Sequence, residues 1–218
     1  MKFQLLTAVT LFIFSSTAYT GGISCPAGVA ILNEDQAQQV FTELKELQNI
    51  PYKYVVDGCD VRAYLGAKHL YEKAKLKSFR VNIESYPSMF MDTPYTFEKG
   101  VDFFRHSVLA FCSQREGKLT PLIFDISFFE GPVSLDQWQS KLIDPKFIRA
   151  DKFEVFTSSM FSLDPNSEAK SEQFSRNDLR CAESVRDRFM QEQRKIERGS
   201  LPYGVGRSKE VIRIGICD

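Results

Sequence analysis

The hydrophobic positions of the chain repeat first at helical spacing and later at strand spacing. Apolar and small side chains recur every three or four residues in 33–47 and 59–74, which predicts two helices. From residue 78 onward, apolar and polar positions alternate, which is typical of strands with one buried face. Such strands are predicted over 78–84, 101–112 and 119–128.

Shorter and more polar elements complete the pattern. Residues 85–100 carry two prolines and a glycine and are predicted to form a loop. Further helices are predicted over 134–142 and 177–198, and further strands over 153–156 and 211–216. Helices followed by a meander of strands predict an α+β fold, in which the 59–74 helix packs across an antiparallel sheet.

The composition is that of an ordinary globular protein. The 218 residues include 28 basic and 28 acidic side chains, so the formal charge is zero. The length after the N-terminal segment suggests one domain over residues 19–218. A balanced charge gives no basic surface for nucleic acid, and no polybasic stretch lies beside an apolar run to favour a membrane. We expect a monomer that binds neither nucleic acid nor membrane.

The first 18 residues are predicted to be a signal peptide. Lys2 supplies a short positive region, and Leu5 to Phe14 form an apolar core of about ten residues. Ser16 and Ala18 then offer the small side chains of a cleavage site, with cleavage after Ala18 or a residue or two later. The apolar run is too short to span a membrane. The sequence therefore predicts a soluble protein that is secreted or periplasmic.

Five cysteines follow this segment: Cys25, Cys59, Cys112, Cys181 and Cys217. An exported protein can form disulfides, and an odd number leaves at least one thiol unpaired. If the other four pair, Cys59 is the natural one to stay free. A bond between Cys181 and Cys217 would tie the last predicted helix to the C-terminus, but the sequence leaves the pairing open.

Cys59 lies where a loop becomes a helix. The preceding Gly58 marks a tight turn at which the backbone can approach a ligand closely. The N-terminus of the helix favours the thiolate form of a cysteine, since free N–H groups and the helix dipole stabilise negative charge. Half of a disulfide is nevertheless the commoner role of a cysteine in an exported protein.

Two further residues suggest a nucleophilic cysteine. His106 lies in a predicted strand whose end can face the helix that bears Cys59, whereas His69 lies mid-helix among charged residues and is expected at the surface. Asp125 interrupts an apolar run, and a buried carboxylate needs a partner. His106, on the preceding strand of a hairpin, is a natural one. Cys59, His106 and Asp125 then match a thiol activated by an imidazolium that a carboxylate orients, although a lone histidine in a strand is more often structural.

Three blocks of the sequence resemble the bacterial protein-glutaminase family, whose core is papain- and transglutaminase-like. Residues 52–63 resemble the family's nucleophile turn, in which Asp-Gly-Cys is followed by x-x-Arg-Ala. Residues 105–109 resemble its histidine-bearing strand, and residues 124–138 its aspartate, Pro-Val and tryptophan segment. The resemblance covers about 50–142 and leaves the helix near 177–198 as a C-terminal extension.

The resemblance also singles out supporting residues, and it shows departures at single residues beside an 85–100 loop that is expected to be longer than in the family. Arg62, Asp57 and Trp138 are candidates for substrate binding or structural support; Arg62 could pair with Asp57 or an adjacent acid, or contact substrate. The family usually has an aromatic residue immediately before the histidine, where this chain has Arg105. Ile126 replaces the proline that often follows the aspartate. Neither departure removes a catalytic atom.

The function that this resemblance implies is deamidation of glutamine side chains in proteins or peptides. Cys59 would form a thioester, ammonia would leave, and water would release glutamate, with no cofactor and no metal ion required. A transglutaminase and a papain-like peptidase would use the same three residues. A secreted binding module stapled by disulfides is the non-catalytic alternative, and a disulfide at Cys59 would favour it.

Overall fold

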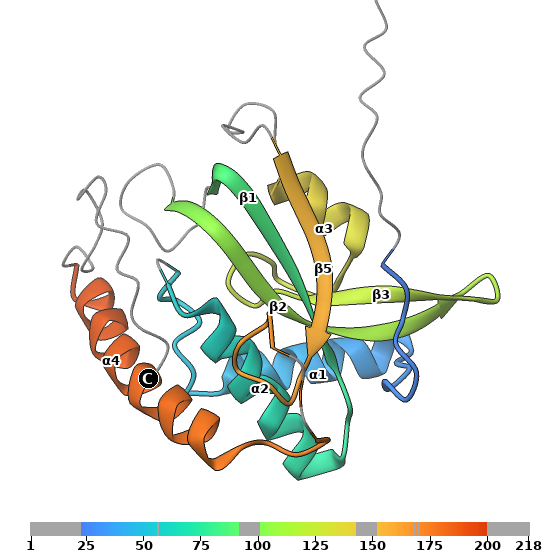
Figure 1. The fold of residues 1–218 in the computed structure, drawn as a ribbon, viewed down its shortest axis with the longest axis horizontal. Helices are drawn as coiled ribbons and strands as arrows, with labels where there is room; N and C mark the ends of the chain where they lie inside the picture. Colours follow the sequence, from blue (N-terminus) through green and yellow to red (C-terminus); the bar gives the residue numbers. More distant parts are fainter. Residues whose placement is uncertain are drawn as a thin grey trace, which may run out of the picture.

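The computed structural model describes residues 23–55, 57–91, 101–142, 152–167, 169 and 171–199. Over these residues the fold is α+β, with one five-stranded antiparallel sheet and four helices (Figure 1). This is the fold class that the order of hydrophobic patterns predicts. The predicted signal peptide and the predicted strand at 211–216 lie outside the described residues.

The helices begin and end close to their predicted bounds. The first helix, α1 (Glu34–Glu46), has Asn33 as its N-cap, and the side chains of Asn33 and Gln36 form a reciprocal capping box. The second, α2, spans Cys59–Ala74 as predicted. The remaining two are α3 (Leu135–Leu142) and α4 (Arg176–Glu197).

The sheet has the strand order β4-β3-β2-β1-β5, and all of its neighbouring strands are antiparallel. A tight turn at Glu116 and Gly117, both with positive φ, joins β2 to β3. The central strand β2 is therefore held by hydrogen bonds along both edges. The strands are β1 (Phe79–Met91), β2 (Val101–Arg115), β3 (Lys118–Phe124), β4 (Val133–Ser134) and β5 (Lys152–Ser159).

Two predictions about the strands are wrong. Residues 85–91 belong to β1 rather than to a loop, because β1 continues past Pro87 through an irregular register between Glu84 and Met89; a bulge accommodates a proline in a strand. The predicted strand 119–128 ends at Phe124. The chain turns there, since the backbone N–H groups of Phe128 and Phe129 both donate to the carbonyl of Asp125. Asp125 therefore lies in a turn and not in the strand.

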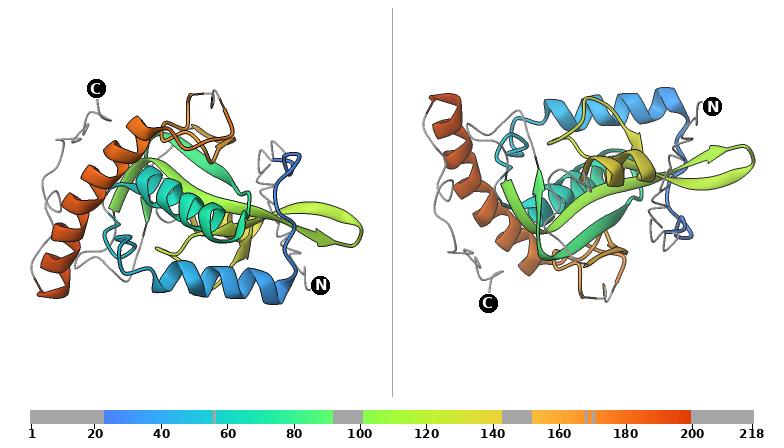
Figure 2. Two further views of the ribbon diagram at one scale, coloured as in Figure 1. Left: turned by 90° about the horizontal axis from the view of Figure 1, so that it is seen from below. Right: turned by 90° about the horizontal axis from the view of Figure 1, so that it is seen from above.

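Helices cover both faces of the sheet. On one face, α1 and α2 pack through a core that includes Phe41, Leu70 and Phe111. On the other face, Trp138 of α3 packs with side chains such as Val81 and Val108. Figure 2 shows α2 lying along the sheet with α1 outside it, and α4 running across one end. The helix that begins with Cys59 is thus packed against the sheet, as predicted.

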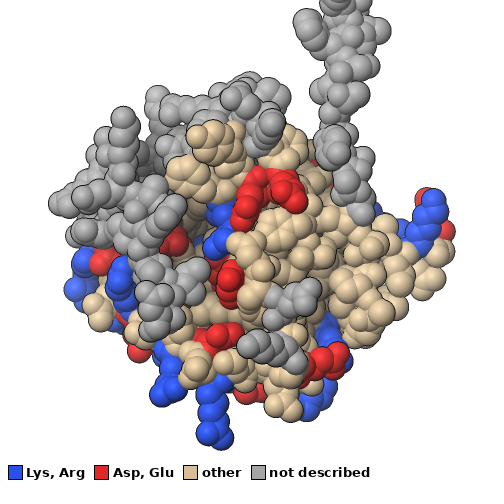
Figure 3. Space-filling view, viewed as in Figure 1, with Lys and Arg blue, Asp and Glu red and all other residues tan. Residues whose placement is uncertain are grey.

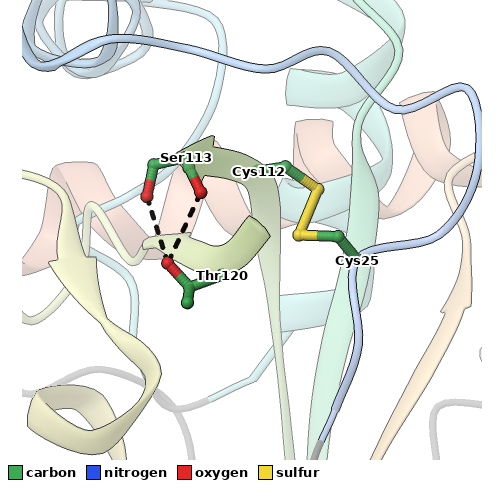
Figure 4. Close-up of a disulfide and its surroundings, with 4 residues drawn as sticks. All are labelled: Cys25, Cys112, Ser113 and Thr120. Carbon is green, nitrogen blue, oxygen red and sulfur yellow. Dashed lines mark hydrogen bonds between the residues drawn. A yellow bond between two sulfur atoms is a disulfide. The ribbon is translucent and has the colours of Figure 1, made fainter. Parts of the chain in front are cut away.

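A disulfide between Cys25 and Cys112 ties the N-terminal segment to β2 (Figure 4). Ile31 adds a parallel bridge to Cys112 at the same place. Cys181 is also disulfide-bonded, and Cys217, its suggested partner, lies outside the described residues. Cys59 is a free thiol, as the sequence predicts. No helix in the described part of the chain is long and apolar enough to cross a membrane.

Candidate active site

Cys59 is the first residue of α2, and a left-handed glycine sets its position. Gly58 has φ near +77°, and a Cβ at Gly58 would lie 2.2 Å from a ring carbon of Phe189 in α4. Any other residue would therefore be strained and would clash. Among the described residues, the close approach that the glycine permits is to Phe189. The result is a buried thiol whose Sγ lies 3.8 Å from the carbonyl oxygen of Arg105 in β2.

His106 and Asp125 form a buried pair beside this thiol. Nε2 of His106 donates to Oδ2 of Asp125 at 2.8 Å, and both side chains are at most 2% exposed. The contact expected across the β2–β3 hairpin is therefore present. Nδ1 of His106 has no hydrogen-bond partner among the described residues, while the side chain of Cys59 lies close enough to raise the pKa of the imidazole.

The surroundings of His106 favour its charged form. Burial lowers the pKa of the imidazole, but the charge and hydrogen bond of Asp125, followed by those of Cys59, raise it to about 9. The ring therefore lies between the carboxyl group of Asp125 and the side chain of Cys59. This is the arrangement in which a histidine can stabilise a thiolate and later donate a proton.

Trp138 fixes the carboxylate from the other side. Its indole Nε1 donates to Oδ2 of Asp125 at 3.0 Å, and its ring stacks on His106 with centroids 6.1 Å apart. Phe128 meets the same imidazole edge-on, with centroids 5.2 Å apart. One oxygen of Asp125 thus accepts two hydrogen bonds in the core, which restricts the orientation of the imidazole. The sequence names Trp138 as a candidate but does not reveal this bond.

Arg62 and Asp57 shape the turn before Cys59. Arg62 is 3% exposed, and its Nη1 donates to the backbone carbonyls of Tyr54 and Asp57 at 2.5 and 2.6 Å. Oδ1 of Asp57 accepts from the N–H of Gly58 at 2.6 Å. Burial raises the pKa of Asp57, while the Gly58 N–H and the charge of Arg62 act in the opposite direction. Arg62 therefore holds the backbone and forms neither side-chain ion pair that the sequence suggests for it.

A cavity of about 20 Å³ lies behind the histidine and aspartate. It is bordered by His106 and Asp125 and by two polar groups that lack hydrogen-bond partners among the described residues, the hydroxyl of Tyr52 and Nη2 of Arg62. A space of this size accommodates one water molecule. The cavity is too small for an amino acid, and Cys59 is not among the residues that line it.

Other titratable groups lie outside this cluster. His69, expected at the surface, is 33% exposed and lies 2.7 Å from Oε1 of Glu43, a residue of α1. Among the described residues, no group of three or more histidine, cysteine, aspartate or glutamate side chains is arranged to hold a metal ion. Over the face drawn in Figure 3, acidic and basic side chains are interspersed.

Comparisons with known proteins concern the segment that contains this site. A family model described as glutaminase matches residues 37–142, the segment that contains Cys59, His106, Asp125 and Trp138. This segment, just under half of the chain, is similar to the glutaminase family. A sequence search of curated proteins finds no match.

Solved glutaminase structures share the fold. The chain superposes on a mutant of pro-protein-glutaminase with a TM-score of 0.60, at 15% identity, over 78% of this chain and 63% of that one. Against a crystal structure of protein-glutaminase the TM-score is 0.57 at 16% identity, over 75% of this chain and 90% of that one. Against the NMR structure of protein-glutaminase from Chryseobacterium proteolyticum, the TM-score is 0.56 at 15% identity, over 82% of this chain and 95% of that one. The chain thus spans just under two thirds of the pro-form.

Proposed function

We propose that the protein deamidates glutamine side chains in protein or peptide substrates. The observation that carries the proposal is the position of the free Cys59, at the start of α2, beside an imidazole held by Asp125 and Trp138. The glutaminase segment contains all of these residues, and the structural neighbours are named protein-glutaminases. These neighbours support a substrate that is a glutamine within a protein, rather than free glutamine.

The proposed reaction begins with Cys59 as the nucleophile. The Cys59 thiolate attacks the side-chain amide carbon, and the carbonyl oxygen becomes an oxyanion. The backbone N–H of Cys59, at the free N-terminus of α2, is the donor in this chain that would stabilise that charge. His106 donates the proton that the leaving nitrogen needs, ammonia departs, and a thioester remains on Cys59.

Hydrolysis of the thioester completes the cycle. The neutral His106 now takes a proton from water, which attacks the thioester carbon. The carbon–sulfur bond breaks, glutamate is released, and the thiolate and imidazolium are restored. Asp125 stabilises the imidazolium through the bond at Nε2, so that Nδ1 remains free to carry the proton.

The free thiol weighs against the alternative of a disulfide-stapled binding module. Such a module would hold Cys59 in a disulfide, whereas Cys59 is unpaired while Cys25, Cys112 and Cys181 are bonded. These three bonded cysteines also support an oxidising compartment, and hence the proposed export of the protein. A transglutaminase would use the same residues but transfer the acyl group to an amine, and a peptidase would use them to cleave a backbone amide.

The experiment is to measure ammonia release from a glutamine-containing protein, with mass spectrometry of the product. We expect ammonia together with a gain of about one mass unit at glutamine, the mass change of amide to acid, and no reaction with Cys59→Ala or His106→Gln. His69→Gln is the matched control, since His69 is the second histidine and pairs with Glu43 instead of the thiol. Cleaved peptide bonds or glutamine–lysine crosslinks in place of glutamate would replace the proposal with a peptidase or a transglutaminase.

A further inference from the structure

Asp60, the residue after Cys59, is bonded to both residues that flank His106. Its Oδ2 accepts from Nη2 of Arg105 at 2.9 Å, and its Oδ1 accepts from the hydroxyl of Ser107 at 2.5 Å. The neighbour of the nucleophile in α2 is thereby joined to the two neighbours of the base in β2. A displacement of the first turn of α2 along β2 would break at least one of these bonds.

The same contacts extend into β1. Ser107 is paired with Asn82 in the sheet, and its hydroxyl oxygen lies 2.7 Å from the side-chain amide of Asn82. Arg105 is paired with Glu84, and the guanidinium lies 3.5 Å from Oε1 of that residue. Asp60 and Arg105 have side chains only 16% and 24% exposed. Partly buried, charge-assisted bonds of this kind are stronger and less screened than surface ion pairs.

The charges of this cluster act on the thiolate. A carboxylate directly after Cys59 disfavours a negative sulfur, and the Asp60 carboxylate is offset by Arg105, which interacts with both Asp60 and Cys59. Behind them lies Arg80 of β1, fully buried, whose charge also interacts with Asp60 and Cys59. Arg80, Arg105 and His106 are thus three cationic side chains of β1 and β2 that interact with Cys59, and two acids, Asp57 and Asp60, lie on either side of Cys59 in the sequence.

We propose that Asp60, Arg105 and Ser107 form a positioning clamp that holds Cys59 against His106 and balances the charge at the thiolate. The expected effect of the clamp on kcat rests on the proposed function, whereas its expected effect on the ionisation of Cys59 does not. Arg105, which directly precedes His106, supplies the guanidinium of the clamp. The clamp makes Asp60 and Arg105 positioning residues, since neither is required to touch the substrate.

The test separates charge from geometry by using neutral replacements. Asp60→Asn and Arg105→Gln each remove one charge, and the double variant removes both. Ser107→Ala removes the hydroxyl that contacts Asp60 and Asn82 without changing charge. The first readout is a pH titration of the ultraviolet absorbance of the thiolate, taken as the difference from the same protein with Cys59→Ala. The second is kcat for deamidation. Lys68→Gln is the control, since it removes a cation of α2 that pairs with Glu72.

The clamp predicts opposite effects from the two charged residues. Arg105→Gln should move the midpoint of the thiolate titration up by about one pH unit, and Asp60→Asn should move it down by a similar amount. The double variant and Lys68→Gln should titrate like the wild type. Ser107→Ala should leave the midpoint in place and reduce kcat about tenfold, because a misplaced base loses rate without a change of charge.

Each departure from this pattern overturns a stated part of the proposal. Midpoints that shift in the same direction, or that stay fixed, refute the charge balance; an unchanged kcat in Ser107→Ala refutes the positioning role. If Asp60→Asn does not fold, Arg105→Gln and Ser107→Ala still decide both parts. The titration needs no substrate, so opposite shifts in a protein that releases no ammonia would uphold the charge balance and reject the proposed function alone.

Discussion

The protonated imidazole of His106 couples the stability of the fold to pH. In the native protein its pKa is about 9, because Asp125 and Cys59 outweigh the effect of burial. In the unfolded chain a histidine titrates near ~6.5. The native state therefore binds the proton more tightly than the unfolded state between these two values. Stability must fall as the proton is removed.

The size of the effect follows from the two pKa values. Each pKa unit corresponds to about 1.4 kcal/mol, so the step from ~6.5 to about 9 corresponds to about 3 kcal/mol of unfolding free energy. Because the folded pKa is the higher one, this contribution is complete below about pH 6.5 and is lost as the pH rises through about 9. A loss of this size is a large fraction of the stability of a typical domain.

The measurement is urea denaturation at several pH values for the wild type and for His106→Gln, which cannot titrate at this position. The difference in unfolding free energy between the two proteins should shrink by about 3 kcal/mol between about pH 6 and about pH 9.5. His69→Gln serves as the control, because His69 is one third exposed. A difference that stays constant or grows with pH would show that His106 is neutral in the native state and would refute the reasoning.

Three further predictions concern the supports of the site. Trp138→Phe removes the N–H that Asp125 accepts at 3.0 Å; it should lower the unfolding free energy by about 2 kcal/mol and slow deamidation, and an unchanged melting temperature and rate would contradict this. Arg62→Met leaves two buried carbonyls without their donor and should cost about 3 kcal/mol in urea denaturation, whereas a loss below about 1 kcal/mol would argue against the backbone role. Replacing Cys25 and Cys112 by alanine removes a disulfide between residues that are 87 positions apart in the sequence. The unfolding free energy should fall by about 4 kcal/mol, which would be seen as a lower melting temperature; equal melting temperatures of the two proteins would contradict this.

The elements that could be predicted are those whose signals are local. The capping pair at Asn33 and the run of small residues after Cys59 lie within single helices, and both helices begin where the sequence indicates. The end of β3 is not a local signal. Residues 122–126 are an apolar run interrupted only by Asp125, as in a buried strand, yet the chain leaves the sheet at Asp125, where two backbone N–H groups bond to its carbonyl. Likewise, nothing within residues 152–159 indicates that they pair with β1.

The contacts of the candidate site also fall into those that the sequence suggests and those that depend on tertiary packing. Residue types and the hairpin suffice to suggest that His106 meets Asp125, because adjacent antiparallel strands bring their residues together. The bond from Trp138 and the clamp at Asp60 join residues from different elements. Their formation depends on how α3 and α2 pack on the sheet, which a one-dimensional pattern does not contain.

The C-terminal helix α4 also contacts the site from another element, and it lies beyond the segment that the family model matches. It lies outside the glutaminase segment, which ends at residue 142, yet its Phe189 occupies the space above Gly58 and stacks on Tyr54 with centroids 4.8 Å apart. Gln193 accepts a hydrogen bond from the backbone N–H of Lys53. Side chains of α4, which the family model does not cover, therefore pack against the turn that precedes Cys59. We therefore expect residues 37–142 alone, without α4, to lack the packing that fixes the conformation of the turn before Cys59.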